Sequence, residues 1–598
     1  MSTPTRSNSV GNPPEVLVNI TSKEETIRQK LEQERLRLAR ELGIEHQPRE
    51  HFKKPVENFF TKSQREHTTI LFGGLTWRHE HLIHGALEGL GYKCEYVPTP
   101  NVSAFQLGKE YGNNGQCNPT YFTVGNLVQH LQALESNGMS RQEIIDNYVF
   151  FTAGACGPCR FGMYEAEYRL ALRNSGFDGF RVMLFQQSGG LNQSEAEAGL
   201  ELNVDFFLAI LNAMNMGDLI GDAGYQIRPY EINKGETDAA LAECMDYLHE
   251  VFKTHRRFTL EGKVGQFVKG LKIGNTAEYI GKFLDQLYGS SYTDSLKEVG
   301  RRLAEVKVDR TRVKPTVKIT GEFWAQTTEG DGNFNMFRFL EREGAQVMTE
   351  PIGTWIMYLI HQAKLMKRDR KGVAEDEAMP EAWRIDKRIK NELKVRTATA
   401  KLTLAEAIFK REWNRMREAL NYLPHELADQ YELQRDDHPF YNSRAAGGEG
   451  HLEVAKNIYY CNRDLAHMVL SLKPFGCMPS TQSDGAQSAV VNMFKDMIYL
   501  PIETSGEGEI NAHSRVQMAL GEAKVKAKQE IARVLEETDL TLEQVRDYAT
   551  DHSELQSGLY RVPHHKGVIG TAANFVKHVS ELMKGDRRSR VSTGHAAD

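Results

Sequence analysis

The chain lacks several patterns that would place it quickly in a functional class. Its formal net charge is −6 over 598 residues, with no domain-wide excess of lysine and arginine, which argues against a nucleic-acid partner. Apolar runs such as residues 69–75 are far shorter than the ~20 residues of a membrane span. The first 16 residues contain no apolar signal core. We therefore predict a cytoplasmic protein that binds neither a membrane nor nucleic acid.

Cysteine is also scarce, because the chain contains only seven. This odd, small number is unsuited to a disulfide scaffold, and in a reducing compartment clustered cysteines more often serve metal or redox chemistry. Cys94, Cys244 and Cys461 fall at the start of a predicted strand, within a helix and at a helix end, so we expect small buried residues there. For Cys461 a ligand role is the alternative, since it lies close to Cys477 in the sequence.

Short apolar runs alternate with amphipathic stretches along most of the chain, which is typical of parallel α/β sheets. Strands are predicted within residues 67–75, 94–100, 147–154, 180–190, 316–325, 466–476 and 497–504. We predict an α/β fold made of flavodoxin-like or Rossmann-like parallel-sheet domains with helical insertions.

The pattern divides the chain into six ranges. They are a partly disordered N-terminal extension (1–65), a first α/β domain (66–195), a helical connector (196–310), a second α/β unit with a helical insertion (311–440), a third α/β unit (441–540), and C-terminal helices with a tail (541–598). The sequence assigns no role to the extension or to the long charged stretch 360–435. Within that stretch, the basic run 364–372 is expected to be a solvated face, with a site for the phosphates of coenzyme A as the alternative.

The other four cysteines lie in loops that lead into predicted helices. Cys156 and Cys159 lie in GACGPCRFG after one strand, Cys477 lies in KPFGCMPS after another, and Cys117 lies in the loop NNGQC. Ligands of open α/β sheets bind at the carboxyl ends of the strands. Free N–H groups at helix N-termini stabilise anionic groups. These four cysteines are therefore predicted to hold a cofactor.

Three kinds of site use cysteines in this way. Zinc sites usually combine two local pairs, whereas only Cys156 and Cys159 form a CxxC pair here. A lone CxxC pair can also be a redox dithiol. Because Cys117 and Cys477 are isolated and distant, they would join the pair only where separate domains meet, as in some iron–sulfur proteins. The pattern favours an iron–sulfur cluster over these two alternatives.

A few charged residues near these loops are weaker candidates. Arg160 could neutralise a cluster or hold a carboxylate or phosphate, or it could form a structural salt bridge. Glu322 could orient a substrate or act as a base, or it could cap the next helix. Glu449 lies at a helix start, where a carboxylate complements the helix dipole. The string HEHLIH at residues 79–84 is expected to be an ordinary polar helix start, since HExxH would require histidine where Ile83 stands.

Several segments together resemble one protein family. They are GQCNPTYF, ACGPCRFGMYE, KITGEFW, NMFRFLEREGAQV, GGEGHLEVAKN and KPFGCMPS. In this order, from about residue 66 to 535, they resemble the 2-hydroxyacyl-CoA dehydratase component family, in the branch associated with acyl-CoA dehydratase activases.

The resemblance implies flavodoxin-like domains with a 4Fe–4S cluster between them, held by Cys117, Cys156, Cys159 and Cys477. It further implies that an ATP-hydrolysing activase passes one electron to this cluster. A small acyl-CoA-like substrate is then reduced to a ketyl radical that expels its hydroxyl group. The chain has no GxxxxGK[ST] loop, so ATP hydrolysis is expected on a separate activase chain. A non-enzymatic iron–sulfur scaffold or sensor and a zinc-stabilised protein are the alternatives, and each is compatible with an oligomer.

Overall fold

The computed structural model describes residues 60–154, 159–186, 190–191, 198–259, 274–371, 383–445 and 448–594, with single helical positions between 27 and 41. The chain divides into two compact units, 1–56 and 57–598, and the second contains everything described below. The predicted ligand Cys156 and most of the predicted N-terminal extension lie outside the described residues.

The first sheet has the strand order β2-β1-β3-β4-β5. Its strands are Thr69–Phe72 (β1), Cys94–Tyr96 (β2), Tyr148–Gly154 (β3), Arg181–Gln186 (β4) and Gly190–Leu191 (β5). β1 to β4 are parallel, whereas β5 pairs antiparallel with β4. The order 2-1-3-4 is that of a flavodoxin-like sheet. All four residues of β1 are buried because helices cover both faces.

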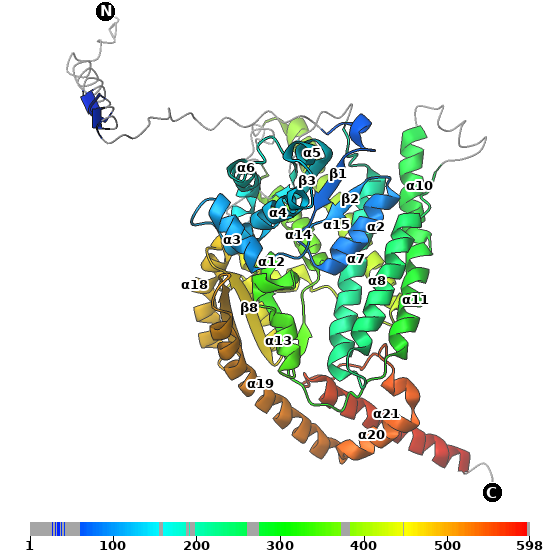
Figure 1. Ribbon diagram of the computed structural model, residues 1–598. Helices are drawn as coiled ribbons and strands as arrows, with labels where there is room; N and C mark the ends of the chain where they lie inside the picture. Colours follow the sequence, from blue (N-terminus) through cyan, green and yellow to red (C-terminus); the bar gives the residue numbers. More distant parts are fainter. Residues whose placement is uncertain are drawn as a thin grey trace, which may run out of the picture. The chain divides into compact units, whose positions relative to one another are not determined.

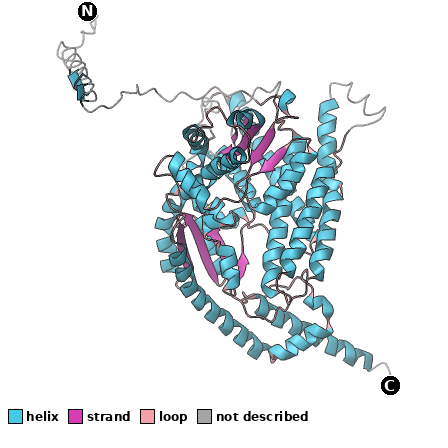
Figure 2. Cartoon of the chain, viewed as in Figure 1, coloured by secondary structure: helices cyan, strands magenta, loops and turns pink. Residues whose placement is uncertain are grey.

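The second sheet repeats this topology with the order β7-β6-β8-β9. Its strands are Thr316–Gly321 (β6), Gln346–Met348 (β7), Met468–Pro474 (β8) and Tyr499–Thr504 (β9), and all pair in parallel. The ranges predicted as second and third α/β units thus contribute their strands to one sheet. Figure 2 shows the two groups of strands, and the predicted α/β fold with parallel sheets and helical insertions is confirmed.

Helices cover both faces of the first sheet. They include Trp77–Gly89 (α2), Asn118–Ser136 (α4), Arg141–Asn147 (α5) and Tyr164–Asn174 (α6), whereas Val102–Tyr111 (α3) packs on α4. Residues of α4 and α6 pack on one face, around Leu71 and Phe150. Residues of α2 pack on the other face, around Ile70 and Val149. Helical residues from the range 204–305 complete that face.

The range 196–310, predicted as a helical connector, contains four long helices that stand together in Figure 1. They are Val204–Ile227 (α7), Glu236–Thr254 (α8), Gly274–Tyr288 (α10) and Ser291–Glu305 (α11). Among the described residues, one stretch, Val204–Tyr230, is long and apolar enough to span a membrane, and 61% of its most apolar window is buried inside the protein. No apolar run of this length was expected from the sequence, because polar residues such as Asn212 and Asp218 interrupt it.

The second sheet lies between two further layers of helices. These helices are Phe323–Thr327 (α12), Met336–Arg342 (α13), Ile352–Asp369 (α14), Ile385–Ala419 (α15), Gln430–Asp437 (α16), Gly450–Asn462 (α17), Met478–Met493 (α18) and Glu509–Thr538 (α19). α13 and α19 pack on the face that carries Val317 and Leu470, whereas α17 contacts β6 and β8 on the other face. α14 to α16 form the helical insertion between β7 and β8.

The described part of the C-terminal range contains two helices and a short 3-10 helix. Leu542–Asp551 (α20) and Thr571–Gly594 (α21) pack against the end of α19 in a separate apolar cluster. Short 3-10 helices occupy Lys62–Gln64 (η1), Arg160–Met163 (η2), Arg228–Tyr230 (η4), Asp331–Asn333 (η5) and Ser553–Gln556 (η7).

Two details of the sequence analysis need correction. Phe60 is buried in the largest core, and Arg65 forms an ion pair of 2.8 Å with Glu201. The packed unit therefore begins before residue 66, within the predicted extension. Lys364, in the basic run expected to be a solvated face, is buried and paired with Glu406, because α15 packs against α14.

Candidate functional site

Three of the four predicted ligand cysteines are described, and each is the residue immediately before a helix. Cys117 precedes α4, Cys159 precedes η2 and Cys477 precedes α18. Proline in the first turn of α4 and of α18 fixes those helix starts. The cysteines thus stand where backbone N–H groups have no partner within their own helix.

The loops of Cys117 and Cys477 pack directly on each other. The N–H of Asn118 donates to the carbonyl of Phe475 at 3.0 Å. Gly476 has a φ of 75°, and a Cβ at this position would lie 3.3 Å from the Cα of Cys117. Glycine is therefore favoured here for two reasons: the backbone is left-handed, and the Cys117 loop approaches it closely. This contact joins the carboxyl end of β8 in the second sheet to the start of α4 on the first.

Cys159 lies beside the loop that leads into α17. A Cβ on Gly448 would lie 3.8 Å from the Cβ of Cys159, and it would overlap the ring of Pro479. The guanidinium of Arg160 donates to the carbonyl of Gly115, in the loop before Cys117. Arg160 therefore ties the Cys159 segment to the Cys117 loop through a backbone carbonyl.

The three thiols share a buried environment with carboxylates. The Sγ of Cys117 lies 3.0 Å from the hydroxyl of Thr120 and 3.3 Å from that of Tyr164. Burial raises the pKa of all three thiols, and the nearby charges of Glu322 and Glu449 raise the pKa of Cys159 and Cys477 further. At neutral pH the groups are therefore thiols, and a soft metal would have to displace their protons.

Glu322 and Glu449 share one site at the carboxyl end of β6. An oxygen of Glu322 accepts from the N–H of Ala325 at 3.0 Å and caps α12, which was one of the two roles considered for it. Burial, opposed by backbone N–H groups and aided by the charge of Glu453, raises the pKa of Glu322 to about 7. Burial and the charge of Glu322 raise the pKa of Glu449 well above its ordinary value. The pair therefore retains a proton near neutral pH.

Glu449 lies at a helix start, as expected, since it directly precedes α17, but its carboxylate does not cap that helix. Its Oε1 accepts instead from the N–H of Phe323 at 3.2 Å, at the start of α12. The sequence analysis also missed Glu453, one turn further along α17. Glu453 is buried and accepts from the hydroxyls of Ser480, at 2.7 Å, and Ser483. The spacing of four residues between Glu449 and Glu453 is the signal that could have indicated it.

The remaining cysteines lie elsewhere. Cys94 and Cys244 are buried, and burial raises the pKa of Cys94 to about 12 and that of Cys244 to about 11. Cys461 is near the end of α17, whereas Glu449 directly precedes its start. At a rise of 1.5 Å per residue, Cys461 is ~18 Å from the cysteine loops along the helix axis, which is too far for it to join them.

The described cysteines do not form a compact ligand set. Among the described His, Cys, Asp and Glu side chains, three whose ligand atoms all lie within 4.8 Å of one another are found at His84, Glu88 and His249. The loops of Cys117, Cys159 and Cys477 are therefore adjacent without their sulfur atoms forming such a group. The 4Fe–4S cluster stays a prediction.

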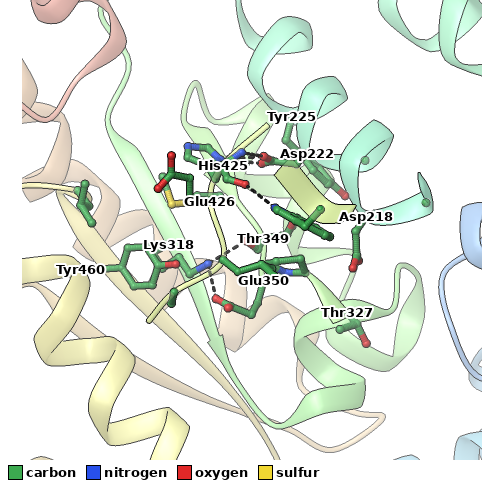
Figure 3. Close-up of a pocket in the computed structure, with 18 of the residues that line it drawn as sticks. Asp218, Asp222, Tyr225, Lys318, Thr327, Thr349, Glu350, His425, Glu426 and Tyr460 are labelled. Atoms are coloured by element: carbon green, nitrogen blue, oxygen red, sulfur yellow. Dashed lines mark hydrogen bonds and ion pairs between the residues drawn. The ribbon is translucent and has the colours of Figure 1, made fainter. Parts of the chain in front are cut away.

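A second candidate is a cavity of about 560 Å³ that is lined by several charged side chains, between α7, the second sheet and the segment after α15. Lys318, on β6, is 1% exposed and forms an ion pair of 2.6 Å with Glu350. Its ammonium also donates to the carbonyl of Thr349 at 2.8 Å and lies 4.4 Å from the ring centroid of Tyr460. Figure 3 shows Lys318 between Tyr460 and Glu350.

The opposite wall of the cavity carries two aspartates of α7. Asp222 accepts from the backbone N–H of His425 at 2.6 Å, and the ring of the same histidine lies 2.9 Å away (Figure 3). Asp218 accepts from the N–H groups of Ile352, at 3.0 Å, and Gly353, at 2.9 Å. Asp222 thus pairs with His425, and Asp218 accepts backbone hydrogen bonds from the start of α14. Both aspartates therefore maintain the contact between α7 and the helical insertion.

No family model matches the chain, and no curated protein matches it.

Proposed function

We propose that this chain is the iron–sulfur component of an ATP-activated system of the 2-hydroxyacyl-CoA dehydratase kind, or of a related reductase. In this proposal it accepts one electron from a separate ATP-dependent activase in the cytoplasm. It then passes the electron to a small substrate, an acyl-CoA-like thioester. The observation that carries the proposal is the meeting of the Cys117, Cys159 and Cys477 loops from two different sheets.

The chemistry of the donor set fits such a cofactor. The ligands would be the thiolates of Cys117, Cys159 and Cys477 together with Cys156, and soft thiolates suit iron–sulfur clusters. Each described thiol lies at a helix start, where unpaired N–H groups stabilise negative charge. When bound, the cluster would supply single-electron transfer.

The carboxyl groups of Glu322 and Glu449, beside the cysteines, would donate and accept the protons of the reaction. Dehydration requires that a proton reach the departing hydroxyl and that another leave the substrate carbon. Glu322, with a pKa of about 7, can both hold and release a proton near neutral pH. Additional negative charge on the thiolates would raise the pKa of both carboxyl groups further, so Glu449 is the group that we expect to stay protonated.

The metal content of anaerobically purified protein tests the cofactor. We expect about four irons and as many sulfides per chain, lost on exposure to air. Serine in place of Cys117, Cys156, Cys159 or Cys477 should strongly lower the iron content, since a hydroxyl ligates iron poorly. Cys244→Ser and Cys461→Ser are matched controls that should retain the iron. Iron-free protein, or equal iron loss in the controls, would overturn the cofactor assignment.

A second measurement separates an enzyme component from an iron–sulfur scaffold or sensor. Iron-loaded protein is mixed with a dehydratase activase, ATP and a reductant, and the reduced cluster is followed by electron paramagnetic resonance. We expect a reduced signal that requires ATP. Glu322→Gln should keep the iron and this signal but lose turnover of a 2-hydroxyacyl-CoA. Loaded protein that takes no electron from the activase would favour the scaffold instead.

A further inference from the structure

Two helices that are distant from the cysteine loops approach each other unusually closely. α2 and α8 lie side by side (Figure 1). A Cβ at Gly85 of α2 would lie 2.6 Å from the carbonyl oxygen of His249, and a Cβ at Gly89 would lie 2.5 Å from that of Phe252. The two glycines, four residues apart, form one face of α2. Only glycine permits this separation of the two backbones.

The close contact gathers three side chains that commonly bind metals. His84 and Glu88 each precede one of these glycines, and His249 faces them from α8. The Nδ1 of His84 lies 2.9 Å from the Nε2 of His249 and 3.8 Å from the Oε2 of Glu88. The third separation, from the Nε2 of His249 to the Oε2 of Glu88, is 3.5 Å.

These separations match the edges of a metal tetrahedron. Ligands bound to zinc at ~2.0–2.1 Å in tetrahedral geometry stand about 3.3–3.4 Å apart. The three distances lie on both sides of that value, so small side-chain rotations would equalise them. Two imidazoles and one carboxylate are the ligands of several zinc sites that leave a fourth position for water.

An outer hydrogen bond orients His84 correctly for this role. The Nε2 of His84 lies 2.9 Å from the carbonyl oxygen of Cys94. Because a carbonyl can only accept, Nε2 carries the hydrogen, and the lone pair of Nδ1 points toward His249 and Glu88. The outer nitrogen of His249 lies 3.5 Å from a carboxylate oxygen of Glu250. Metal-binding histidines characteristically have such outer partners.

The carboxylate of Glu88 is available to a cation. Its Oε2 is buried and accepts no hydrogen bond from the described residues. Lys253 donates to the other oxygen, Oε1, at 3.4 Å, its ammonium lies 3.3 Å from Oε2, and its side chain is 44% exposed. This flexible side chain can move into solvent when a metal takes its place, so the site is accessible without rearrangement of either helix.

We propose that His84, Glu88 and His249 bind a divalent transition metal of the zinc class, with water as the fourth ligand. The metal would join α2, which covers the first sheet, to α8 of the helical connector. The segment HEHLIH at residues 79–84 contributes one ligand, His84. Glu88 comes from the next turn of α2, and His249 comes from α8.

Zinc binding to the full chain, stripped of metal by a chelator, tests this proposal. Beside any zinc taken up by the cysteines, titration calorimetry should show a site that is weakened at least 100-fold in His249→Gln and in Glu88→Gln. His255→Gln, just after the end of α8, is the matched control and should bind like the wild type. Cobalt bound there should show no thiolate-to-metal charge-transfer absorption, which separates this site from the cysteines.

The melting temperature provides a second readout that does not depend on calorimetry. Zinc should raise it for the wild type and for His255→Gln but not for the two ligand variants. The metal-free variants should retain the circular dichroism of the wild type. Zinc affinity that is equal in all four proteins, or cobalt bound only through thiolates, would overturn the site. The iron analysis of the cysteine variants is unaffected by either outcome, so the two proposals fail independently.

Discussion

Replacement of Lys318 by methionine removes a buried cation and leaves its partner in place. Glu350 is 3% exposed, and its other cationic neighbour is Lys456, at 3.7 Å. Loss of one member of a buried ion pair typically destabilises a protein by about 3–5 kcal/mol. Because Lys456 continues to compensate part of the charge of Glu350, we expect a loss near the lower end, about 3 kcal/mol.

This loss can be expressed as a melting temperature. With an unfolding entropy of roughly 2.1 cal/mol/K per residue over about 500 cooperating residues, it corresponds to a decrease of about 3 °C. The double variant Lys318→Met/Glu350→Gln should be less destabilised than the sum of the two single variants. We expect a coupling of about 1–3 kcal/mol between these two neighbouring groups.

The loss of stability in Lys318→Met should depend on pH through the ionisation of Glu350. Burial raises the pKa of Glu350, but the ammonium groups of Lys318 and Lys456 lower it below its ordinary value of 4.5. A lowered pKa contributes stability above the ordinary value, and the contribution is lost as the pH falls through the folded-state pKa. Without Lys318 the pKa of Glu350 should rise, so its carboxyl group can take up a proton. The difference between wild type and variant should therefore be largest near pH 7 and smaller near pH 5.

Urea unfolding at pH 5, 6 and 7, followed by circular dichroism, measures this difference. The matched control is Lys410→Met, which removes a half-exposed lysine from the same cavity wall and should cost less than about 1 kcal/mol. A loss for Lys318→Met that is constant over this pH range would refute the reasoning. So would a loss no greater than that of the control.

Three further changes test other parts of the structure by thermal unfolding. Burial raises the pKa of Glu80 to about 8, so wild-type stability should fall relative to Glu80→Gln as the pH rises from 5 to 8; parallel pH profiles would contradict this. Gly125→Ala would overlap the carbonyl of Ala104 and should cost about 1–3 kcal/mol, whereas Gly521→Ala, in open space on α19, should be neutral or stabilising. Deletion of residues 1–56 should leave the melting temperature within about 1 °C, whereas Phe60→Ala should lower it clearly.

The sequence predicted elements better than it predicted their partners. The runs around Ile70, Val149 and Leu470 indicated buried parallel strands because both faces of each sheet are covered. The same pattern did not indicate that β6 and β8 pair, since a long helical insertion separates them and periodicity carries no information on pairing.

The candidate sites show the same division. Cys117, Cys159 and Cys477 could be placed before helices because glycine and proline mark those loops. No local pattern marks Lys318 within its strand, and its partners Glu350 and Tyr460 come from distant segments. The His84–His249 contact likewise depends on how two helices pack, which no local pattern contains.

The contact between the Cys117 and Cys477 loops has a consequence for how the protein is made. At a synthesis rate of ~5–20 residues per second, Cys117 leaves the ribosome roughly 20–70 s before Cys477. The first loop must therefore wait for its partner while the second half of the chain is still being translated. During that interval the Cys117 thiol lacks the cover that the Gly476 turn later provides, so a nascent chain is more vulnerable to oxidants than the finished protein.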